Sequence, residues 1–166
     1  FLLPWNKEKL CTLHYALLTN TKYTGTIGAY RSGQGVIEDN DGTPVFYATP
    51  PDAIDGQMDY LLEWINKYST AYNPVVSATI MFHEFESIHP FEDGNGRTGR
   101  TLFHLYLQQN GLANSYLCKI DENILKEKET YYQLLAYTDY SKSFTELIDY
   151  MSERILGSYS EAVQYL

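Results

Sequence analysis

The chain has 166 residues, a formal net charge of −9 at pH 7 and 44% hydrophobic residues. This length suits one domain with a sizeable core, and the acidic balance argues against a nucleic-acid-binding surface. Two distant cysteines, Cys11 and Cys118, exclude a disulfide framework and a cysteine-based metal cluster. No apolar run is long enough to span a membrane. We therefore expect a single cytoplasmic domain with no nucleic-acid and no membrane partner.

The first element in chain order is a predicted helix from Asn6 to Leu18, where apolar residues recur at helical spacing. His14 shares the apolar face, which indicates a packed core histidine rather than a catalyst. Residues 21–30 are rich in glycine and polar side chains and predict irregular structure.

A β-hairpin is predicted over about residues 35–47. Residues 35–37 and 45–47 are the only convincing strand patterns, and Asp41-Gly42 between them is a typical hairpin turn. A two-stranded hairpin is marginal on its own, so we expect it to pack on helices or to receive a partner strand.

The rest of the chain predicts helices, which makes the fold class mainly all-α with one hairpin. The capping and periodicity signals place these helices at Ala53 or Asp55 to Tyr68, Pro74 to Ile88, about Asn95 to Gln109, Asp121 to about Tyr137, and from a cap at Ser143 to a stop at Gly157.

The loop between the second and third of these helices concentrates reactive side chains. Pro90 ends the preceding helix, because the residue before a proline disfavours helical geometry. Asn95 is expected to cap the next helix, so the free backbone N–H groups of residues 94–97 point into the loop. Such a helix start is an anion-binding site, and glycines allow a phosphate to approach the backbone.

The start of that helix is poorly chosen for stability alone. Arg97 and Arg100 put positive charge at the positive end of the helix dipole, and Gly99 costs about 1 kcal/mol relative to alanine. A bound anion would resolve this conflict. The two arginines are spaced i and i+3, so both can reach the same polyphosphate.

Two further residues of the loop suggest chemistry. Asp93 can hold Mg²⁺ through one carboxylate while phosphate oxygens and water complete the shell. His89 has a pKa suited to proton abstraction near neutral pH. We expect Phe91 to anchor the loop by packing, and Glu92 and Thr98 to be solvated.

A competing motif overlaps this loop. Gly94-x-Gly96-x-x-Gly99 matches the dinucleotide-binding pattern, but that pattern requires an apolar strand immediately before it. The preceding segment predicts a helix instead, which disfavours a Rossmann fold. No P-loop sequence occurs.

The run His89-Pro90-Phe91-x-Asp93-Gly94-Asn95-Gly96-Arg97-x-x-Arg100 resembles the complete signature of the Fic family. The resemblance implies a single Fic domain over residues 1–166, with a core at about 10–155, that transfers AMP from ATP to a Ser, Thr or Tyr hydroxyl of a target protein. It implies His89 as general base, Asp93 as Mg²⁺ ligand and a nucleotide and phosphate site formed by Gly94, Asn95, Gly96, Arg97, Arg100 and Tyr132. It also implies that the hairpin is a flap that binds the target chain through Val36, Ile37, Val45 and Phe46.

Many family members carry an inhibitory sequence, Ser/Thr-x-x-x-Glu-Gly/Asn, whose glutamate pairs with the last arginine of the signature. Only Glu122 precedes a glycine or asparagine here, and Cys118 stands four residues before it. We therefore expect the inhibitory helix upstream of Phe1 or on a separate antitoxin-like protein. The motif also leaves open another nucleotide donor, CDP-choline, removal of AMP, or a non-enzymatic binding module.

Overall fold

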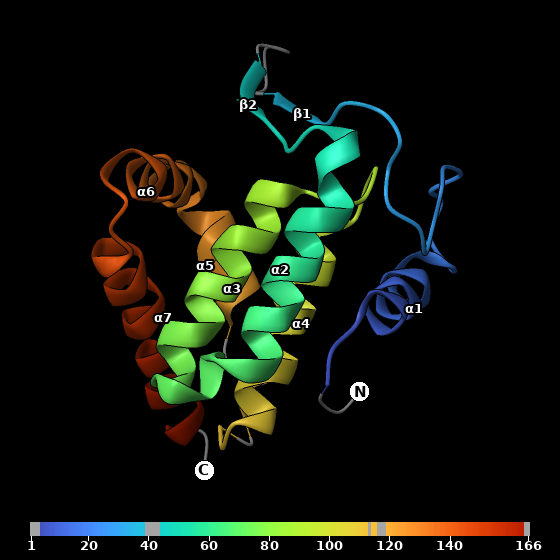
Figure 1. Cartoon of the computed structure of the whole chain (residues 1–166). Helices are drawn as coiled ribbons and strands as arrows, with labels where there is room; N and C mark the ends of the chain where they lie inside the picture. Colours follow the sequence, from blue (N-terminus) through green and yellow to red (C-terminus); the bar gives the residue numbers. More distant parts are fainter. Residues whose placement is uncertain (1–3, 39–43, 113, 116–118, 165–166) are drawn as a thin grey trace. The chain divides into compact units, whose positions relative to one another are not determined.

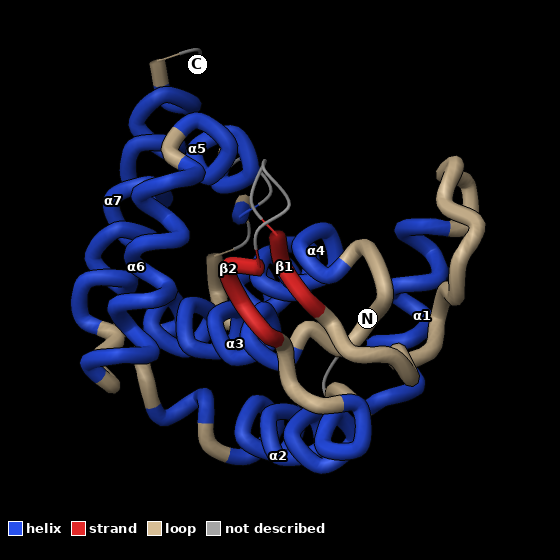
Figure 2. Tube along the Cα trace, turned by 90° about the horizontal axis from the view of Figure 1, so that it is seen from above, coloured by secondary structure: helices blue, strands red, loops and turns tan. Residues whose placement is uncertain are grey.

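The computed structural model confirms a mainly all-α fold with one β-hairpin. Seven α-helices and one two-stranded antiparallel sheet occur in the described part of the chain, which comprises residues 4–38, 44–112, 114–115 and 119–164. Strand is confined to the hairpin in these ranges (Figure 2). None of the described helices combines the length and the apolar character that crossing a membrane requires.

The chain forms two compact units, which we call the first and the second unit. The first unit consists of Phe1–Ser69 and Glu84–Thr101, and the second of Thr70–His83 and Leu102–Leu166. Two helices, α3 (Pro74–Ile88) and α4 (Asn95–Gln109), contribute residues to both units. The single domain over residues 1–166 stays a prediction.

The first unit begins with α1 (Lys7–Leu18), close to the predicted bounds. Asn6 caps it, because its side chain accepts a hydrogen bond from the Lys9 N–H at 2.9 Å. His14 is fully buried on its inner face, as predicted. An irregular segment then leads to the hairpin, also as predicted from its composition.

The hairpin consists of β1 (Val36–Glu38) and β2 (Pro44–Tyr47), with Val36 paired to Tyr47 and a register shift after Ile37. The predicted Asp41-Gly42 turn lies outside the described residues. A single 3₁₀ turn joins β2 to α2 (Ile54–Lys67), so the hairpin lies at the N-terminal end of α2 (Figure 1).

The helix α4 ends as the sequence predicts. Gly111 adopts φ +102°, a conformation that favours glycine, and the Leu112 N–H donates to the Leu107 carbonyl at 3.0 Å. This bond is typical of a helix stop with glycine just beyond the last turn.

The second unit corrects two predictions. The single helix predicted from Asp121 to about Tyr137 is in fact α5 (Ile120–Lys126) and α6 (Lys128–Ser141), separated at Glu127, which has non-helical φ −119° and ψ 33°. The carboxylate of Glu127 accepts a hydrogen bond from Arg154 Nε at 3.0 Å, a long-range contact that helical periodicity cannot reveal.

The last helix, α7 (Thr145–Val163), continues through the predicted stop at Gly157. Buried residues on both sides of this glycine, Ile155 and Ser158, hold the helix against its neighbours. Ser143 still accepts a hydrogen bond from the Thr145 N–H, at 3.4 Å.

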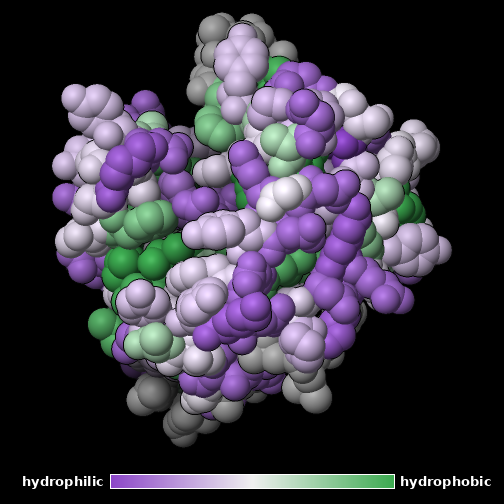
Figure 3. Space-filling view, viewed as in Figure 1, coloured by the Kyte–Doolittle hydropathy of each residue, from purple (hydrophilic) through white to green (hydrophobic). Residues whose placement is uncertain are grey.

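Apolar surface in the second unit gathers around α7. Leu156 is 67% exposed, and Val75 and Val76 of α3 are half-buried in the same shallow groove, which Tyr159 also lines. Figure 3 shows hydrophobic residues on the left of the view, the side on which α7 lies.

Candidate active site

The residues of the predicted site all belong to the first unit, apart from Tyr132. The helix α3 ends at Ile88, and His89 adopts φ +52°, which is strained for a residue with a side chain. The His89 N–H still donates to the Phe85 carbonyl at 3.0 Å. The chain therefore turns sharply at His89, as expected before Pro90.

Asn95 fixes the loop in a way that the sequence did not predict. It begins α4, as expected, but its side chain does not cap the helix. Its Oδ1 accepts from the Phe91 N–H and its Nδ2 donates to the Phe91 carbonyl, both at 2.8 Å and both buried. The side-chain amide thus satisfies both backbone groups of Phe91, so it serves as a clip across the loop.

Thr98 corrects another expectation, because it is buried rather than solvated. Its N–H and its hydroxyl both donate to the Gly94 carbonyl, at 2.9 and 2.8 Å. This carbonyl opens the helical ladder of α4, so Gly94 occupies the capping position that we had assigned to Asn95.

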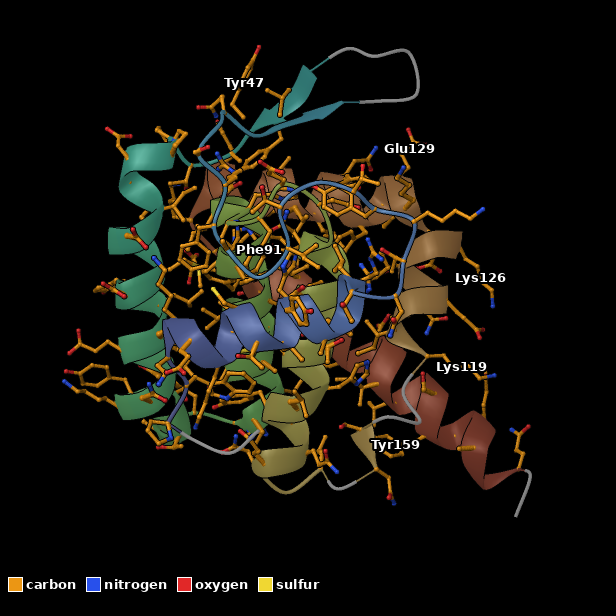
Figure 4. All side chains as sticks on the ribbon, turned by 90° about the vertical axis from the view of Figure 1, so that its right-hand side faces the viewer. Tyr47, Phe91, Lys119, Lys126, Glu129 and Tyr159 are labelled. Carbon is orange, nitrogen blue, oxygen red and sulfur yellow. The ribbon has the colours of Figure 1, made fainter. Side chains whose placement is uncertain are left out.

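Phe91 is fully buried and anchors the loop, as predicted. Its ring stacks on His14 of α1 with centroids 3.8 Å apart and meets Tyr30 edge-on at 5.4 Å. In Figure 4 Phe91 lies beside α1, which carries His14.

His14 also orients the loop through hydrogen bonds to backbone. Its Nδ1 accepts from the Gly28 N–H at 2.8 Å, so Nε2 carries the hydrogen and donates to the Asp93 carbonyl at 2.9 Å. Burial lowers the pKa of His14, which keeps this neutral tautomer in place. A core histidine was predicted, but its role in holding Asp93 was not.

Glu92 is exposed, yet it is not merely solvated. Its Oε2 accepts from the Tyr23 hydroxyl at 3.0 Å and from the Thr26 N–H at 3.1 Å. The bond from the Thr26 N–H is the main cause that lowers the pKa of Glu92. The carboxylate therefore connects the segment after α1 to the loop between α3 and α4 by hydrogen bonds.

Arg31 stabilises the end of α3 through hydrogen bonds to backbone carbonyls. It is only 5% exposed, its Nε donates to the His89 carbonyl at 2.8 Å, and its Nη2 donates to the Ile88 carbonyl at 3.3 Å. In the sequence, Gly28-x-Tyr30-Arg31 resembles the segment that leads into the flap of Fic proteins, which indicates no particular role for Arg31. Its position in a glycine-flanked polar segment gave no sign of burial.

His89 is poised to be a neutral base. Burial, assisted by the positive charge of Arg31, lowers the pKa of its imidazole below the ordinary value of 6.5. The ring is therefore largely unprotonated at pH 7 and available to accept a proton.

Asp93 lies in the loop between α3 and α4, with its carboxylate half exposed. Its Oδ1 accepts from the Gly94 N–H at 2.6 Å, and its Oδ2 forms an ion pair with Arg97 Nη2 at 3.1 Å. Each carboxylate oxygen has two acceptor sites, so each retains one for another partner. Among the described residues no group of three or more His, Cys, Asp or Glu side chains could hold a metal alone. Asp93 therefore fits Mg²⁺ only as a single protein ligand, with ligand phosphate oxygens and water supplying the rest.

The first turn of α4 provides the anion-binding surface. The N–H groups of residues 95–97 have no intrahelical acceptor, because the ladder begins with the Thr98 N–H. Gly94 has φ +78°, and a Cβ there would lie 2.6 Å from Leu18 Cδ1. A Cβ at Gly96 would lie 2.7 Å from Arg100 Nη1, so this glycine lets the guanidinium lie close to the helix start.

Glu86 is a half-buried acid in the last turn of α3, and the sequence did not single it out. Its Oε1 is buried without a hydrogen-bond partner among the described residues. Burial raises its pKa to about 7, although the charge of Arg100 opposes the shift. An acidic residue within an otherwise apolar helix was the signal that could have found it.

The remaining predicted site residues lie in two places. Val36, Ile37, Val45 and Phe46 occupy the two strands of the hairpin, and Val36 is 39% exposed. Tyr132 lies on α6 in the second unit, 43% exposed, beside Tyr131 and with the Lys128 ammonium 5.6 Å from its ring. Its adenine contact stays a prediction.

The fold and the site together define a helical domain whose central loop combines a neutral histidine with a cationic helix start. The model of the Fic/DOC family matches residues 4–107 of this chain. The chain belongs to the Fic/DOC family.

Related proteins agree with this assignment. A probable protein adenylyltransferase of Aquifex aeolicus is 41% identical over 70 residues, which cover 42% of this chain and 21% of the relative. A protein adenylyltransferase Fic of Nematostella vectensis is 25% identical over 135 residues, or 80% of this chain and 29% of the relative. The chain thus spans less than a third of either relative.

The same architecture occurs in a solved structure. A Fic family protein from Desulfovibrio desulfuricans G20 superimposes with a TM-score of 0.84 at 31% identity, covering 97% of this chain and 49% of that structure. The complete fold of this chain therefore corresponds to about half of a larger relative.

Proposed function

We propose that this chain is a protein adenylyltransferase that moves AMP from ATP to a Ser, Thr or Tyr hydroxyl of a target protein. The observation that carries the proposal is that a half-buried, neutral imidazole, His89, is joined by a short loop to a helix start with N–H groups that lack an intrahelical acceptor and with two arginines. Such a helix start binds phosphates, and a neutral imidazole accepts the proton of an attacking hydroxyl.

The proposed reaction is a displacement at the α-phosphorus of ATP. The target hydroxyl oxygen forms the new bond to phosphorus, its proton passes to His89, and the bond to pyrophosphate breaks. Because phosphoryl-type transfer depends mainly on positioning and charge stabilisation, the loop must hold both reactants in line. The buried clip of Asn95 on Phe91 supports that rigidity.

The polyphosphate would lie against the first turn of α4. Gly94, Asn95 and Gly96 would surround it with backbone, while Arg97 and Arg100 would neutralise its charge. Tyr132 would contact the adenine. Asp93 would hold Mg²⁺ together with the phosphates, and the ion would stabilise the charge that develops on them.

The hairpin would orient the target. An extended segment of the target protein can add a strand to an exposed sheet edge, which holds its backbone with little sequence requirement. Val36, Ile37, Val45 and Phe46 would form this flap. We further propose that the protein acts in the cytoplasm.

Control of the reaction would come from a glutamate outside residues 1–166. An inhibitory helix upstream or a separate antitoxin-like protein would supply it and pair it with Arg100. Addition of such a helix should suppress transfer when Arg100 is intact. Unchanged activity would count against this arrangement.

The decisive experiment is intact-mass analysis after incubation with ATP and Mg²⁺, with His89→Ala as control and cell lysate as a source of targets. A mass gain equal to one AMP in wild-type protein or in a target, lost in the variant, is expected. A gain only with another nucleoside triphosphate or CDP-choline would assign a different donor. No transfer from any donor would contradict the proposal.

A further inference from the structure

Arg31 joins two parts of the first unit that the chain separates widely. Besides the carbonyls of Ile88 and His89, its guanidinium donates to the Gly33 carbonyl through Nη1 at 2.7 Å and to the Thr49 carbonyl through Nη2. Gly33 precedes β1 and Thr49 follows β2. One side chain therefore bonds the base of the hairpin to the end of α3, which His89 follows directly.

The backbone of Arg31 strengthens the same connection. Its N–H donates to the Pro90 carbonyl at 2.9 Å, so main chain and side chain both hold the turn at the end of α3. The negative end of the α3 dipole faces this cation, which offsets part of the cost of its burial.

The base of the hairpin is itself closed by hydrogen bonds between its two sides. The Ala48 N–H donates to the Gly35 carbonyl at 3.1 Å, and Gln34 Nε2 donates to the Ala48 carbonyl at 2.9 Å. A Cβ at Gly35 would lie 2.9 Å from Arg31 Nε. The guanidinium thus packs closely against this base, and a side chain at residue 35 would displace it.

The chemistry of arginine suits this role. Its planar group presents five N–H donors in fixed directions, which can bind several carbonyls at once. A lysine at the same place would keep the charge but lose the planar arrangement of five N–H donors. The acceptors here are carbonyl oxygens rather than a carboxylate, so the residue arranges backbone instead of forming an ion pair.

We propose that Arg31 is a positioning residue that fixes the base of the hairpin to the end of α3, so that an acceptor chain bound along the hairpin is aligned with His89. This inference rests on the proposed adenylyl transfer. Arg31 touches neither reactant in this arrangement and acts through the two backbone segments.

The first arm of the test uses no substrate. Amide hydrogen exchange by NMR compares wild type with Arg31→Lys, and with Arg154→Lys as an arginine in the second unit that binds Glu127. The reporter amides are Arg31, Ala48 and His89, which bond to the carbonyls of Pro90, Gly35 and Phe85.

We expect Arg31→Lys to accelerate exchange at all three reporters by about 10–100-fold, as for loss of one or two hydrogen bonds from a charged donor. Amides of α1 should be unchanged, and Arg154→Lys should leave the reporters unchanged. Faster exchange only at Ala48, only at Arg31 and His89, or at amides throughout the first unit would overturn the proposal. Gly35→Ala, which displaces the guanidinium, should reproduce the pattern if Arg31→Lys fails to fold.

The second arm measures acceptors with ATP and Mg²⁺. Transfer to an extended peptide containing serine, threonine and tyrosine should fall at least about tenfold in kcat for Arg31→Lys, since the peptide depends on the hairpin. Release of AMP to water and the KM for ATP should change by less than about threefold, because neither requires alignment with the hairpin.

Equal losses for peptide and water would overturn the positioning role. If the wild type transfers nothing but exchange responds as expected, the link between hairpin and α3 stands and the proposed activity fails. The two conclusions are therefore separable.

Discussion

The loop that follows α3 and the helices α5 to α7 are stabilised in different ways. In the loop, buried side chains bond directly to backbone: Asn95 to Phe91, His14 to Asp93, and Arg31 to Ile88 and His89. Around α7, apolar residues such as Met151 and Ile155 form the core, and the main ion pair joins the partly exposed Arg154 and Glu127.

The difference shows that directional hydrogen bonds position the loop, whereas apolar packing mainly stabilises the helices around α7. Apolar packing is non-directional and tolerates small shifts, whereas a hydrogen bond to a carbonyl fixes both distance and angle. The loop has few regular backbone bonds of its own, so side chains provide them. Changes in the loop should therefore affect the reaction beyond their effect on stability, and changes around α7 should not.

The largest effect is expected from His89→Ala. Loss of a general base should lower transfer by about 10²–10⁴-fold while ATP still binds. The pKa of His89 is lowered by burial, so the wild-type rate should rise with pH through a midpoint below 6.5 and level off near neutrality. Single-turnover rates and ATP binding measure both. A parallel loss of ATP affinity would contradict the role.

Removal of the Asn95 clip should come next. Asn95→Ala leaves the buried N–H and carbonyl of Phe91 unpaired, which should lower the free energy of unfolding by about 2–5 kcal/mol. Transfer should also fall at temperatures where the variant is folded. Denaturant unfolding and the transfer assay measure the two effects.

Asn66 offers a matched control within the first unit. Its side chain makes the same pair of hydrogen bonds to the backbone N–H and carbonyl of Trp5, both at 2.7 Å. Asn66→Ala should lose stability without lowering the rate of the folded protein. Equal transfer rates for folded Asn95→Ala and Asn66→Ala would contradict a specific effect of the loop on the reaction.

Glu86→Gln should make stability less dependent on pH. The pKa of Glu86 is raised to about 7, so the folded protein retains a proton that the unfolded chain loses above about pH 4.5. Wild-type stability should therefore decline between about pH 4.5 and 7 and stay low above. The variant should be more stable by about 1–3 kcal/mol at pH 8 and similar at pH 4.

Thermal or denaturant unfolding across this pH range tests the expectation. The exposed Glu129 on α6, labelled in Figure 4, provides the control Glu129→Gln, which should behave like wild type. A Glu86→Gln variant that is less stable at pH 8 would show that the charge of Glu86 is fully compensated by Arg100.

The smallest effect is expected from Gly96→Ala. The added Cβ would lie 2.7 Å from Arg100 Nη1 and displace this guanidinium, which should raise the KM for ATP by about tenfold. In α7 a Cβ at Gly157 meets nothing within 4 Å. Gly157→Ala should leave ATP binding unchanged and raise stability by up to about 1 kcal/mol. Similar KM values for both variants would refute the role of Gly96.

The sequence alone determined the elements whose signals are local. Apolar periodicity and capping residues placed α1 to α4 near their observed bounds, and the run from His89 to Arg100 indicated the candidate site and identified the family. These features depend on residues a few positions apart, so the order of side chains along the chain contains them.

Tertiary structure decided the features that depend on distant partners. Arg31 bonds to carbonyls near residues 33, 49 and 88, and Glu127 breaks a periodic helix beside Arg154. Asn95, which the sequence marked as a cap, instead binds Phe91 because that buried backbone needs a donor and an acceptor. A backbone carbonyl has no sequence identity, so hydrogen bonds to it become visible only when the chain is folded.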